Sequence, residues 1–321
     1  NLDIPSPDII LKENFKKLTS IFPNMIKYYL KELANVMFIV TPLCSLVGIA
    51  AALQYVKFTS ETAIEVALIL IALALANMSV DTLNDYADYK RGIDFETVHT
   101  KFSGGPVTLL VDGKIKPKPT LIMALIVFSI ALAIGAYFVI KVPVLAFIMA
   151  IGAITILFYS NRFLYTRFLG EPMLFVVYTL VPLGSFIALT GSISHITSVL
   201  FVSIPVGIIV ALVLLINEVP DRDVDKRHGR KSTAVLVYDL QKISIIYLSF
   251  QMIALAVLAV GVLFHIIKVY TLLPLAAIPL MFFAYSGIKK YKDQKQFEKY
   301  MGADVAYFLS FVLLLALGEL L

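Results

Sequence analysis

Long apolar stretches recur along the whole chain, and they constrain its fold more than any other feature of the sequence. Each stretch is about 18–25 residues long and is followed by a short charged segment. A helix of that length can cross a hydrocarbon core of about 30 Å. Hydrophobic residues make up 60% of the 321 residues, which is more apolar surface than a soluble domain of this size can keep from water. The sequence therefore predicts an all-α, polytopic membrane protein.

We expect nine membrane-spanning helices in a single domain, residues 33–321, packed around a central cavity that opens on the cytoplasmic side. The expected spans are residues 33–56, 61–86, 119–140, 143–160, 172–190, 196–218, 241–266, 270–288 and 303–320. A separate segment, residues 1–32, mixes lysines with apolar side chains. This mixture predicts an amphipathic helix that lies on the membrane surface.

The basic residues are distributed very unevenly between the two sides of the predicted bundle. Of the 27 Lys and Arg residues, only Lys57, Lys141 and Lys268 fall in loops on the side opposite to the N-terminal segment. Membrane proteins keep such an excess of positive charge in the cytoplasm. We therefore expect the N-terminus and the long polar loops, residues 87–118 and 219–240, to be cytoplasmic, and the C-terminus to lie outside.

Two acidic motifs, at the inner ends of the second and sixth expected spans, carry the candidate chemistry. The first, residues 84–94, reads NDYADYKRGID, and the second, residues 217–225, reads NEVPDRDVD. In both motifs an Asn is followed four residues later by an Asp. Two such motifs in equivalent positions suggest a distant internal duplication whose halves face one cavity.

Helix geometry brings the side chains of the second motif together. Residues spaced by four form one stripe on a helix, so Asn217, Asp221 and Asp225 are expected to point the same way. Pro220 lies within this stripe, and a proline there should distort the helix and free the carbonyl of Ile216.

The first motif requires a turn in addition to a helix. Asn84 and Asp88 share a helix face, but Asp94 lies ten residues after Asn84 and would not share it in a continuous helix. A glycine at position 92 can end the helix. We expect Gly92 to let the chain turn so that Asp94 comes back toward Asp88.

The spacing of the acids indicates a bound cation. Carboxylates four residues apart on one helix face repel each other, and near a membrane they also lack full hydration. Carboxylate and amide oxygens, without Cys or a well-placed His, suit Mg²⁺ or Mn²⁺ rather than zinc. We expect two Mg²⁺ ions that complete their coordination with phosphate oxygens of a diphosphate. The predicted ligands are Asn84, Asp88, Asp94, Asn217, Asp221 and Asp225.

The acidic motifs and a diphosphate together carry more negative charge than two Mg²⁺ ions neutralise. Basic residues in the same two loops can balance the remainder: Lys101, Arg230 and Lys231. A Lys or Arg in a cytoplasmic loop more often serves topology than substrate binding. The three residues are nevertheless the candidates for holding a diphosphate.

At these residues the chain resembles the UbiA superfamily of intramembrane aromatic prenyltransferases, which has nine spans and paired NxxxD-type motifs after spans two and six. The pattern of residues 84–94 resembles the menaquinone branch of that family, the 1,4-dihydroxy-2-naphthoate polyprenyltransferases. Residues 158–160 (FYS), 169–171 (LGE) and 229–232 (GRKS) also resemble segments of the family. Lys101 falls where the branch has a basic residue near the diphosphate. Glu218 departs from the pattern, since many relatives have a second Asn there.

The resemblance implies Mg²⁺-dependent transfer of a polyprenyl group from an allylic diphosphate to a lipid-soluble aromatic acceptor. The expected acceptor is 1,4-dihydroxy-2-naphthoate, in menaquinone biosynthesis; 4-hydroxybenzoate and geranylgeranylglyceryl phosphate are the open alternatives. The implied catalytic residues are Asp88, Asp94, Asp221, Asp225 and Tyr159, and the implied substrate-binding residues are Asn84, Lys101, Asn217, Arg230 and Lys231.

A cation-coupled transporter is the rival interpretation from another class of protein. Duplicated halves and acidic residues in helices would fit a transporter. Transporters, however, place ionisable groups near the membrane midplane, and here the acids concentrate at the inner ends of two spans. The position of the acids therefore favours an enzyme.

Overall fold

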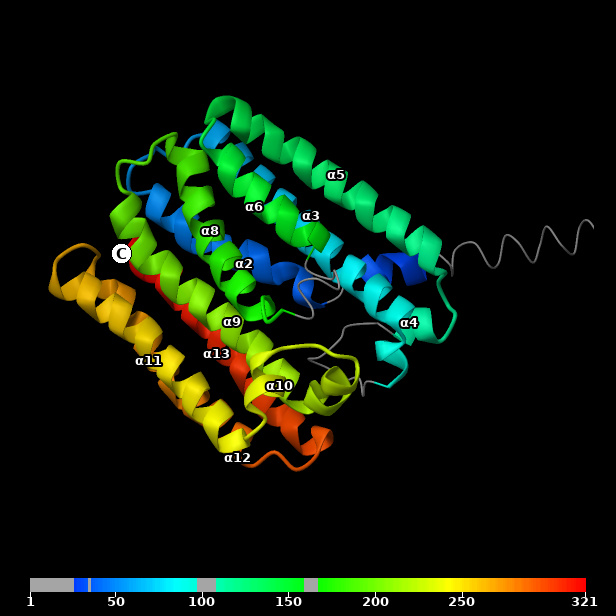
Figure 1. Cartoon of the computed structure of the whole chain (residues 1–321). Coiled ribbons are helices and arrows are strands. Elements are labelled where there is room, and N and C mark those ends of the chain that lie inside the picture. The colour runs from blue at the N-terminus through cyan, green and yellow to red at the C-terminus, as the bar shows by residue number, and fades with distance from the viewer. Residues whose placement is uncertain (1–25, 34–35, 97–107, 159–166) are drawn as a thin grey trace, which may run out of the picture.

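The computed structural model describes residues 26–33, 36–96, 108–158 and 167–321, and every regular element in these ranges is helical (Figure 1). Residues 26–33 are helical. The further elements are η1 (Val36–Ile39), α2 (Val40–Ala52), α3 (Ser60–Arg91), η2 (Ile93–Phe95), α4 (Thr108–Val111), α5 (Pro117–Lys141), α6 (Leu145–Phe158), α8 (Gly170–Thr190), α9 (Ile196–Arg227), α10 (Thr233–Val237), α11 (Leu240–Leu263), η3 (Val269–Ala277), α12 (Ile278–Lys289) and α13 (Gln294–Leu320). The all-α prediction is confirmed for this part of the chain. Most of the predicted surface helix, residues 1–25, lies outside the described residues.

Seven helices in the described ranges are long and apolar enough to cross a membrane. They are α3, α5, α8, α9, α11, the continuous segment of η3 and α12, and α13. The other two predicted spans contain α2 and α6, which are apolar but only 13 and 14 residues long. Each predicted span thus holds a helix, and seven of those helices have the dimensions of a full membrane crossing.

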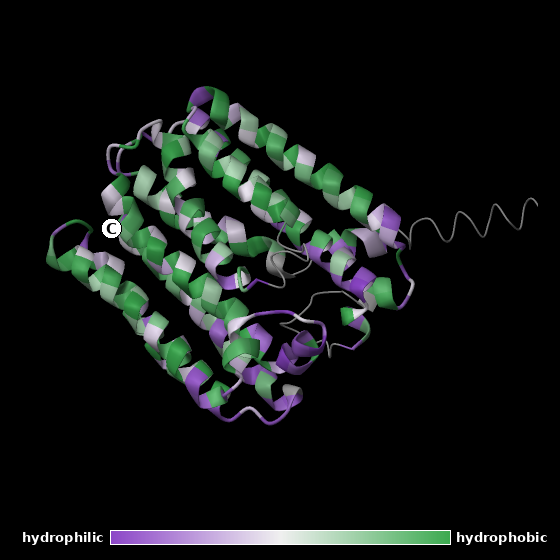
Figure 2. Cartoon of the chain, viewed as in Figure 1, coloured by the Kyte–Doolittle hydropathy of each residue, from purple (hydrophilic) through white to green (hydrophobic). Residues whose placement is uncertain are grey.

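The helices pack side by side in one bundle. α3 packs on α5, α2 on α8, α8 on α9, and α9 on α11, while α13 contacts α2, α9 and α12. Figure 1 shows α5 along one edge of the bundle and α11 with α12 along the opposite edge. Hydrophilic residues gather at the end of the bundle where α4, α10 and the last turns of α3 lie, and the C-terminus lies at the other end (Figure 2).

A glycine allows the closest approach between α2 and α8. A Cβ atom on Gly48 would overlap the backbone carbonyl of Pro182, a residue inside α8, and would come within 2.8 Å of its Cα. Backbone atoms within a helix cannot move aside as the end of a flexible side chain can. This contact therefore requires glycine on α2.

Replacing Gly48 by Ala is expected to destabilise the protein by about 1–3 kcal/mol or more, because the added methyl group forces the two helices apart. Thermal unfolding of the detergent-solubilised protein measures the effect. Gly152→Ala in α6 is the matched control, since a Cβ there meets no atom within 4 Å. An unchanged midpoint in Gly48→Ala would show that the α2–α8 contact is looser than described.

Candidate active site

The first acidic motif forms the end of α3 and the turn that follows it. Gly92 caps the helix with a φ of 80°, and its N–H donates to the carbonyl of Tyr89 at 3.1 Å. Glycine adopts this left-handed conformation without a Cβ penalty. The chain then enters η2, where the side chain of Asp94 is buried. The prediction that Gly92 ends the helix is confirmed.

Asp88 is the centre of the contacts within the first motif. The amide of Asn84 donates to one carboxylate oxygen of Asp88 at 3.2 Å, and Arg91 forms an ion pair with the other oxygen at 3.3 Å. Asp88 is buried, and both contacts come from its own helix. The i, i+4 pairing of Asn84 with Asp88 is the one that the sequence spacing predicts.

The second acidic motif lies on the last turns of α9. The helix continues through Pro220 as far as Arg227, so the proline does not interrupt it. Asp225 is 2% exposed, whereas Asp221 is half-buried. Within the described residues, Oδ1 of Asn217 and Oδ2 of Asp225 are buried without a hydrogen-bond partner. Both are oxygens that a cation could use.

The second motif is followed by a turn like the one after the first. Gly229 has a φ of 78°, and the chain beyond it turns back toward α9. Arg230 then forms ion pairs with Glu218 at 3.2 Å and with Asp225 at 3.7 Å. In the first motif, a glycine in the left-handed conformation brings Asp94 back toward Asp88. In the second, the same kind of turn brings Arg230 back toward Asp225.

Glu218, whose role the sequence leaves open, is buried beside Glu171 and holds Arg230. Glu171 in turn accepts a hydrogen bond from the backbone N–H of Thr233 at 2.6 Å, which ties the start of α8 to the start of α10. Burial of two neighbouring carboxylates is costly unless a cation compensates them. Arg230 supplies that charge, so the contribution of Glu218 to the site is to position the arginine.

The two motifs face each other across the bundle. Asp88 of α3 and Asp225 of α9 repel each other electrostatically, and Arg230 attracts both. Burial, and then the charges of Asp88 and Glu32, raise the pKa of Asp94 to about 8. In the absence of a cation, Asp94 therefore holds a proton at neutral pH.

Glu32 is a buried acid beside the first motif and is not among the site residues predicted from the sequence. It is 0% exposed, and neither carboxylate oxygen has a hydrogen-bond partner within the described ranges. Burial raises the pKa of Glu32 to about 7, and its charge acts on both Asp85 and Asp94. Its neighbours Lys31 and Leu33 form no motif with it, so its burial was not apparent from the sequence.

Glu32→Gln is expected to weaken Mg²⁺ binding by about tenfold, because a negative charge beside Asp94 is worth on the order of 1 kcal/mol to a nearby cation. A Mg²⁺ titration of diphosphate binding measures this change. Glu96→Gln is the control, since the exposed Glu96 pairs with Arg227 at 2.9 Å and with His228 at 3.0 Å. Equal Mg²⁺ affinities in both variants would exclude Glu32 from the cation site.

The donor set fits a cation that arrives with a phosphate ligand. Within the described residues, no three Asp, Glu, His or Cys side chains already converge on one point as a preformed metal site. The buried oxygens without partners, on Asn217 and Asp225, nevertheless suit a hard cation. Mg²⁺ commonly takes one or two carboxylates and completes its shell with water and substrate phosphates.

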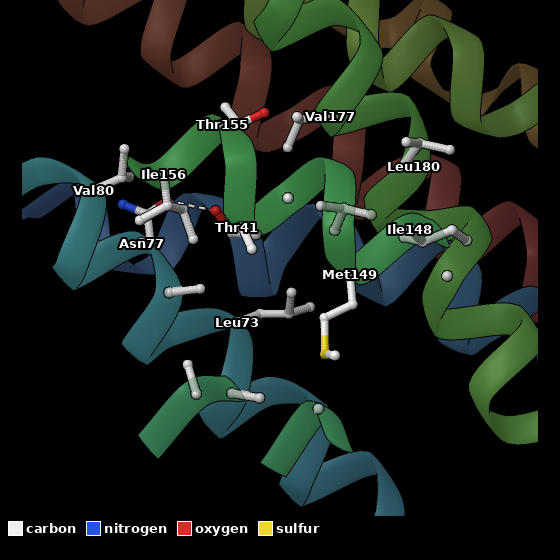
Figure 3. Close-up of a pocket in the computed structure, with 18 of the residues that line it drawn as sticks. Thr41, Leu73, Asn77, Val80, Ile148, Met149, Thr155, Ile156, Val177 and Leu180 are labelled. Atoms are coloured by element: carbon white, nitrogen blue, oxygen red, sulfur yellow. Dashed lines mark hydrogen bonds between the residues drawn. The ribbon is translucent and has the colours of Figure 1, made fainter. Parts of the chain in front are cut away.

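A cavity of 430 Å³ extends from the first acidic motif into the bundle (Figure 3). Side chains of α3, α5, α6 and α8 line it together with Thr41 of α2, and they are mostly apolar. Its lining on α3 runs from Ile69 to Asp85, which corresponds to about 24 Å along the helix axis. Polar residues of α3 gather at one end of that stretch: Asp81, Asn84 and Asp85. The cavity thus joins an acidic end to a long apolar body.

Three further residues predicted for the site, Lys231, Lys101 and Tyr159, have no described contact with the acidic motifs. Lys231 is exposed, next to the buried Ser232 that caps α10. Lys101 and Tyr159 lie outside the described residues. The structure therefore brings Asn84, Asp88, Asp94, Asp225 and Arg230 together and leaves Lys231 at the surface.

Comparison with known proteins identifies the family. The sequence matches the UbiA prenyltransferase family over residues 41–312. The chain belongs to this family. A 1,4-dihydroxy-2-naphthoate octaprenyltransferase of Bacillus subtilis (strain 168) is 28% identical over 213 residues, which cover 64% of this UbiA-family chain and 64% of the relative. The chain thus matches somewhat less than two thirds of that relative's length.

Solved structures share the fold of this family member at low sequence identity. A UbiA homologue from Aeropyrum pernix K1 superimposes with a TM-score of 0.63 and 18% identity, over 87% of this chain and 96% of that one. A structure described as digeranylgeranylglyceryl phosphate synthase gives a TM-score of 0.60 and 14% identity, over 92% and 99% of the two chains. At these identities the likeness concerns the fold alone.

Proposed function

We propose that this UbiA-family member transfers a polyprenyl group from an allylic diphosphate to an aromatic acceptor within the membrane. The observation that carries the proposal is the cavity, which joins a long apolar body to the first acidic motif at Asn84 and Asp85. An amphiphile with a diphosphate head and an isoprenoid tail has the same division of polarity. The head would lie at the acidic motifs, and the tail would lie between α3, α5, α6 and α8.

The proposed roles follow from the positions of the side chains. The six predicted ligands, Asn84, Asp88, Asp94, Asn217, Asp221 and Asp225, would hold two Mg²⁺ ions, with Mn²⁺ as a substitute. When bound, Mg²⁺ neutralises charge on the diphosphate and makes it a better leaving group. Arg230 would bind diphosphate oxygens, since a guanidinium donates two parallel hydrogen bonds to such a group. Lys101 and Lys231 would add positive charge, and Tyr159 would line the reacting centre.

The proposed transfer forms one carbon–carbon bond. The allylic carbon–oxygen bond of the donor breaks, and its electron pair leaves with the diphosphate. A pair of ring electrons of the acceptor forms the new bond to the allylic carbon. The ring then regains aromaticity by losing the substituent at that carbon, a proton or a carboxyl group. Exclusion of water by the apolar cavity protects the cationic fragment from hydrolysis.

The proposed acceptor is 1,4-dihydroxy-2-naphthoate. The similarity to the Bacillus subtilis octaprenyltransferase supports this choice, as does the form of the first motif, residues 84–94. The alternatives remain 4-hydroxybenzoate and geranylgeranylglyceryl phosphate. The uneven distribution of Lys and Arg supports a cytoplasmic N-terminus and active site, with the C-terminus outside.

The decisive experiment incubates the purified protein with geranylgeranyl diphosphate, Mg²⁺ and 1,4-dihydroxy-2-naphthoate. We expect diphosphate release together with a prenylated naphthalenoid product, and neither when EDTA is present. Parallel reactions with the other two acceptors test the choice of acceptor. A product formed only from one of those would correct the acceptor and retain the reaction. No product from any donor and acceptor would contradict prenyl transfer and favour the transporter.

A further inference from the structure

A network of hydrogen bonds between four side chains forms part of the wall of the cavity. Thr41 comes from α2, Asn77 and Asp81 from α3, and Tyr178 from α8, and all four line the cavity. The hydroxyl of Thr41 donates to Oδ1 of Asn77, as Figure 3 shows. The hydroxyl of Tyr178 donates to the same oxygen at 3.2 Å, and Nδ2 of Asn77 donates to Asp81 at 2.8 Å. Three helices thus meet at one amide.

The other hydroxyl groups in the apolar part of the cavity wall behave differently. Thr155 of α6 donates to the carbonyl of Ile151 at 2.8 Å, and Ser185 of α8 donates to the carbonyl of Val181 at 2.8 Å. Each satisfies its hydrogen bond within its own helix, as polar side chains in apolar surroundings commonly do. The four-residue network, in contrast, directs its polar groups toward one another across helices.

The network fixes the orientation of the Asn77 amide and, through it, of a carboxylate. Asn77 is buried, and two hydroxyl donors at its oxygen leave its NH₂ group facing Asp81. The carboxylate of Asp81 is thereby held as a hydrogen-bond acceptor in the cavity wall. Asp81 precedes Asn84 by three residues, about 4.5 Å along the helix axis, on the side toward the apolar body. Asp88 lies seven residues after Asp81, about 10.5 Å along the axis and on the same face, so a group bound at Asp81 would lie about two helical turns from a carboxylate that holds the diphosphate.

We propose that Asp81 binds a hydroxyl group of the aromatic acceptor, and that Asn77, Thr41 and Tyr178 are the residues that position its carboxylate. This inference rests on the proposed prenyl transfer and adds the site that recognises the acceptor. An ionised carboxylate forms a short, strong hydrogen bond with a phenolic hydroxyl where water is excluded. The bond also increases electron density in the ring, which favours attack on the allylic carbon. A ring without that hydroxyl forgoes this hydrogen bond and binds less tightly.

The test compares 1,4-dihydroxy-2-naphthoate with its two monomethyl ethers, which keep the ring and block one hydroxyl each. With the wild-type protein, kcat/KM is expected to fall by about 10- to 100-fold for one ether, the range for a hydrogen bond to a charged group. With Asp81→Asn, the preference for the free hydroxyl over that ether is expected to shrink to about threefold or less. Tyr178→Phe and Asn77→Leu, which loosen the carboxylate, are expected to give intermediate preferences.

Two controls separate recognition from folding and from metal binding. Ser185→Ala removes a buried hydroxyl of the cavity wall outside the network, and it is expected to keep the wild-type preference. Mg²⁺-dependent binding of geranylgeranyl thiodiphosphate, a donor analogue that reacts poorly, is expected to be unchanged in Asp81→Asn, which shows that the variant is folded.

The possible outcomes distinguish this inference from the proposed function. If wild-type protein prenylates the acceptor and Asp81→Asn keeps the full preference for the free hydroxyl, the acceptor site is wrong and the enzyme assignment stands. Loss of donor-analogue binding in Asp81→Asn, with binding retained in Ser185→Ala, would assign Asp81 to the cation site and overturn the inference. No transfer by the wild-type protein to any acceptor would remove both proposals.

Discussion

Replacing Asp88 by Asn is expected to lower kcat for prenyl transfer by about 10²–10³-fold, the range for loss of one group that stabilises charge in a transition state. Asp225→Asn is expected to have a similar effect. The two carboxylates come from different helices and repel each other at the end of the bundle, an arrangement that a cation between them would relieve. Because both act on one cation and one diphosphate, the double variant should be little worse than either single variant. A Mg²⁺ titration of kcat with each variant measures the effect.

Asp223→Asn provides the matched control for these two variants. Asp223 belongs to the same acidic motif as Asp225, and its replacement removes the same charge as the other two, but its exposed carboxylate accepts a hydrogen bond from Tyr238. Its replacement is expected to change kcat by less than about threefold, as for most surface substitutions. A loss of activity equal in all three variants would mean that net negative charge matters rather than position, and would contradict the assignment of Asp88 and Asp225 as ligands.

The local geometry of the two motifs was largely predictable from sequence. The i, i+4 spacing of Asn84 and Asp88 gives the observed hydrogen bond, and Gly92 ends α3 as expected. Both features depend only on helix periodicity and on the backbone freedom of glycine, which are properties of short segments. The equivalent turn at Gly229 has the same cause, although its consequence, the return of Arg230 to Asp225, required the structure.

Contacts between distant segments were not predictable in the same way. Glu32 lies more than fifty residues before Asp85 and Asp94, the acids on which its charge acts, and its segment packs through Tyr28 and Tyr29 against α4. Thr41, Asn77 and Tyr178 meet only because α2, α3 and α8 converge on one cavity. Single-sequence periodicity shows which face of a helix is polar but does not show which polar groups of other helices face it.

Two helices, α3 and α9, end later than the spans predicted for them, because hydropathy marks the end of an apolar stretch and not the end of a helix. α3 continues to Arg91 and α9 to Arg227, beyond the predicted ends at residues 86 and 218. Hydropathy falls where charged residues begin, but Lys and Arg are good helix formers, so the helix continues past the apolar stretch. These additional turns carry Asp88, Asp221 and Asp225. Three of the metal-binding candidates therefore lie on the last turns of two helices rather than in loops.

The cavity makes a second prediction with a large effect, on the length of the prenyl donor. Ala188 packs at the end of the cavity away from the acids, in a buried apolar cluster with Ile69 and Phe138. A phenylalanine at position 188 would fill the space for the end of a long tail and leave the acidic end unchanged. Ala188→Phe is expected to lower kcat/KM for geranylgeranyl diphosphate by about tenfold or more, because two methylene groups of the tail that lose their buried position cost about 1.6 kcal/mol. The value for the shorter geranyl diphosphate should change by less than about threefold, as for substitutions remote from a ligand.

Ala76→Phe tests the same idea closer to the acidic end of the cavity. Ala76 precedes Asn84 by eight residues, about 12 Å along α3, so bulk there would obstruct tails of both lengths. We expect kcat/KM to fall for geranyl and geranylgeranyl diphosphate alike, while Mg²⁺-dependent binding of inorganic diphosphate is retained in both variants. The dependence of each variant's kcat/KM on donor length identifies the tail site, because a general loss of stability would lower the use of both donors equally. If Ala188→Phe lowers the use of both donors equally, the tail does not extend along this cavity and must leave the bundle between other helices.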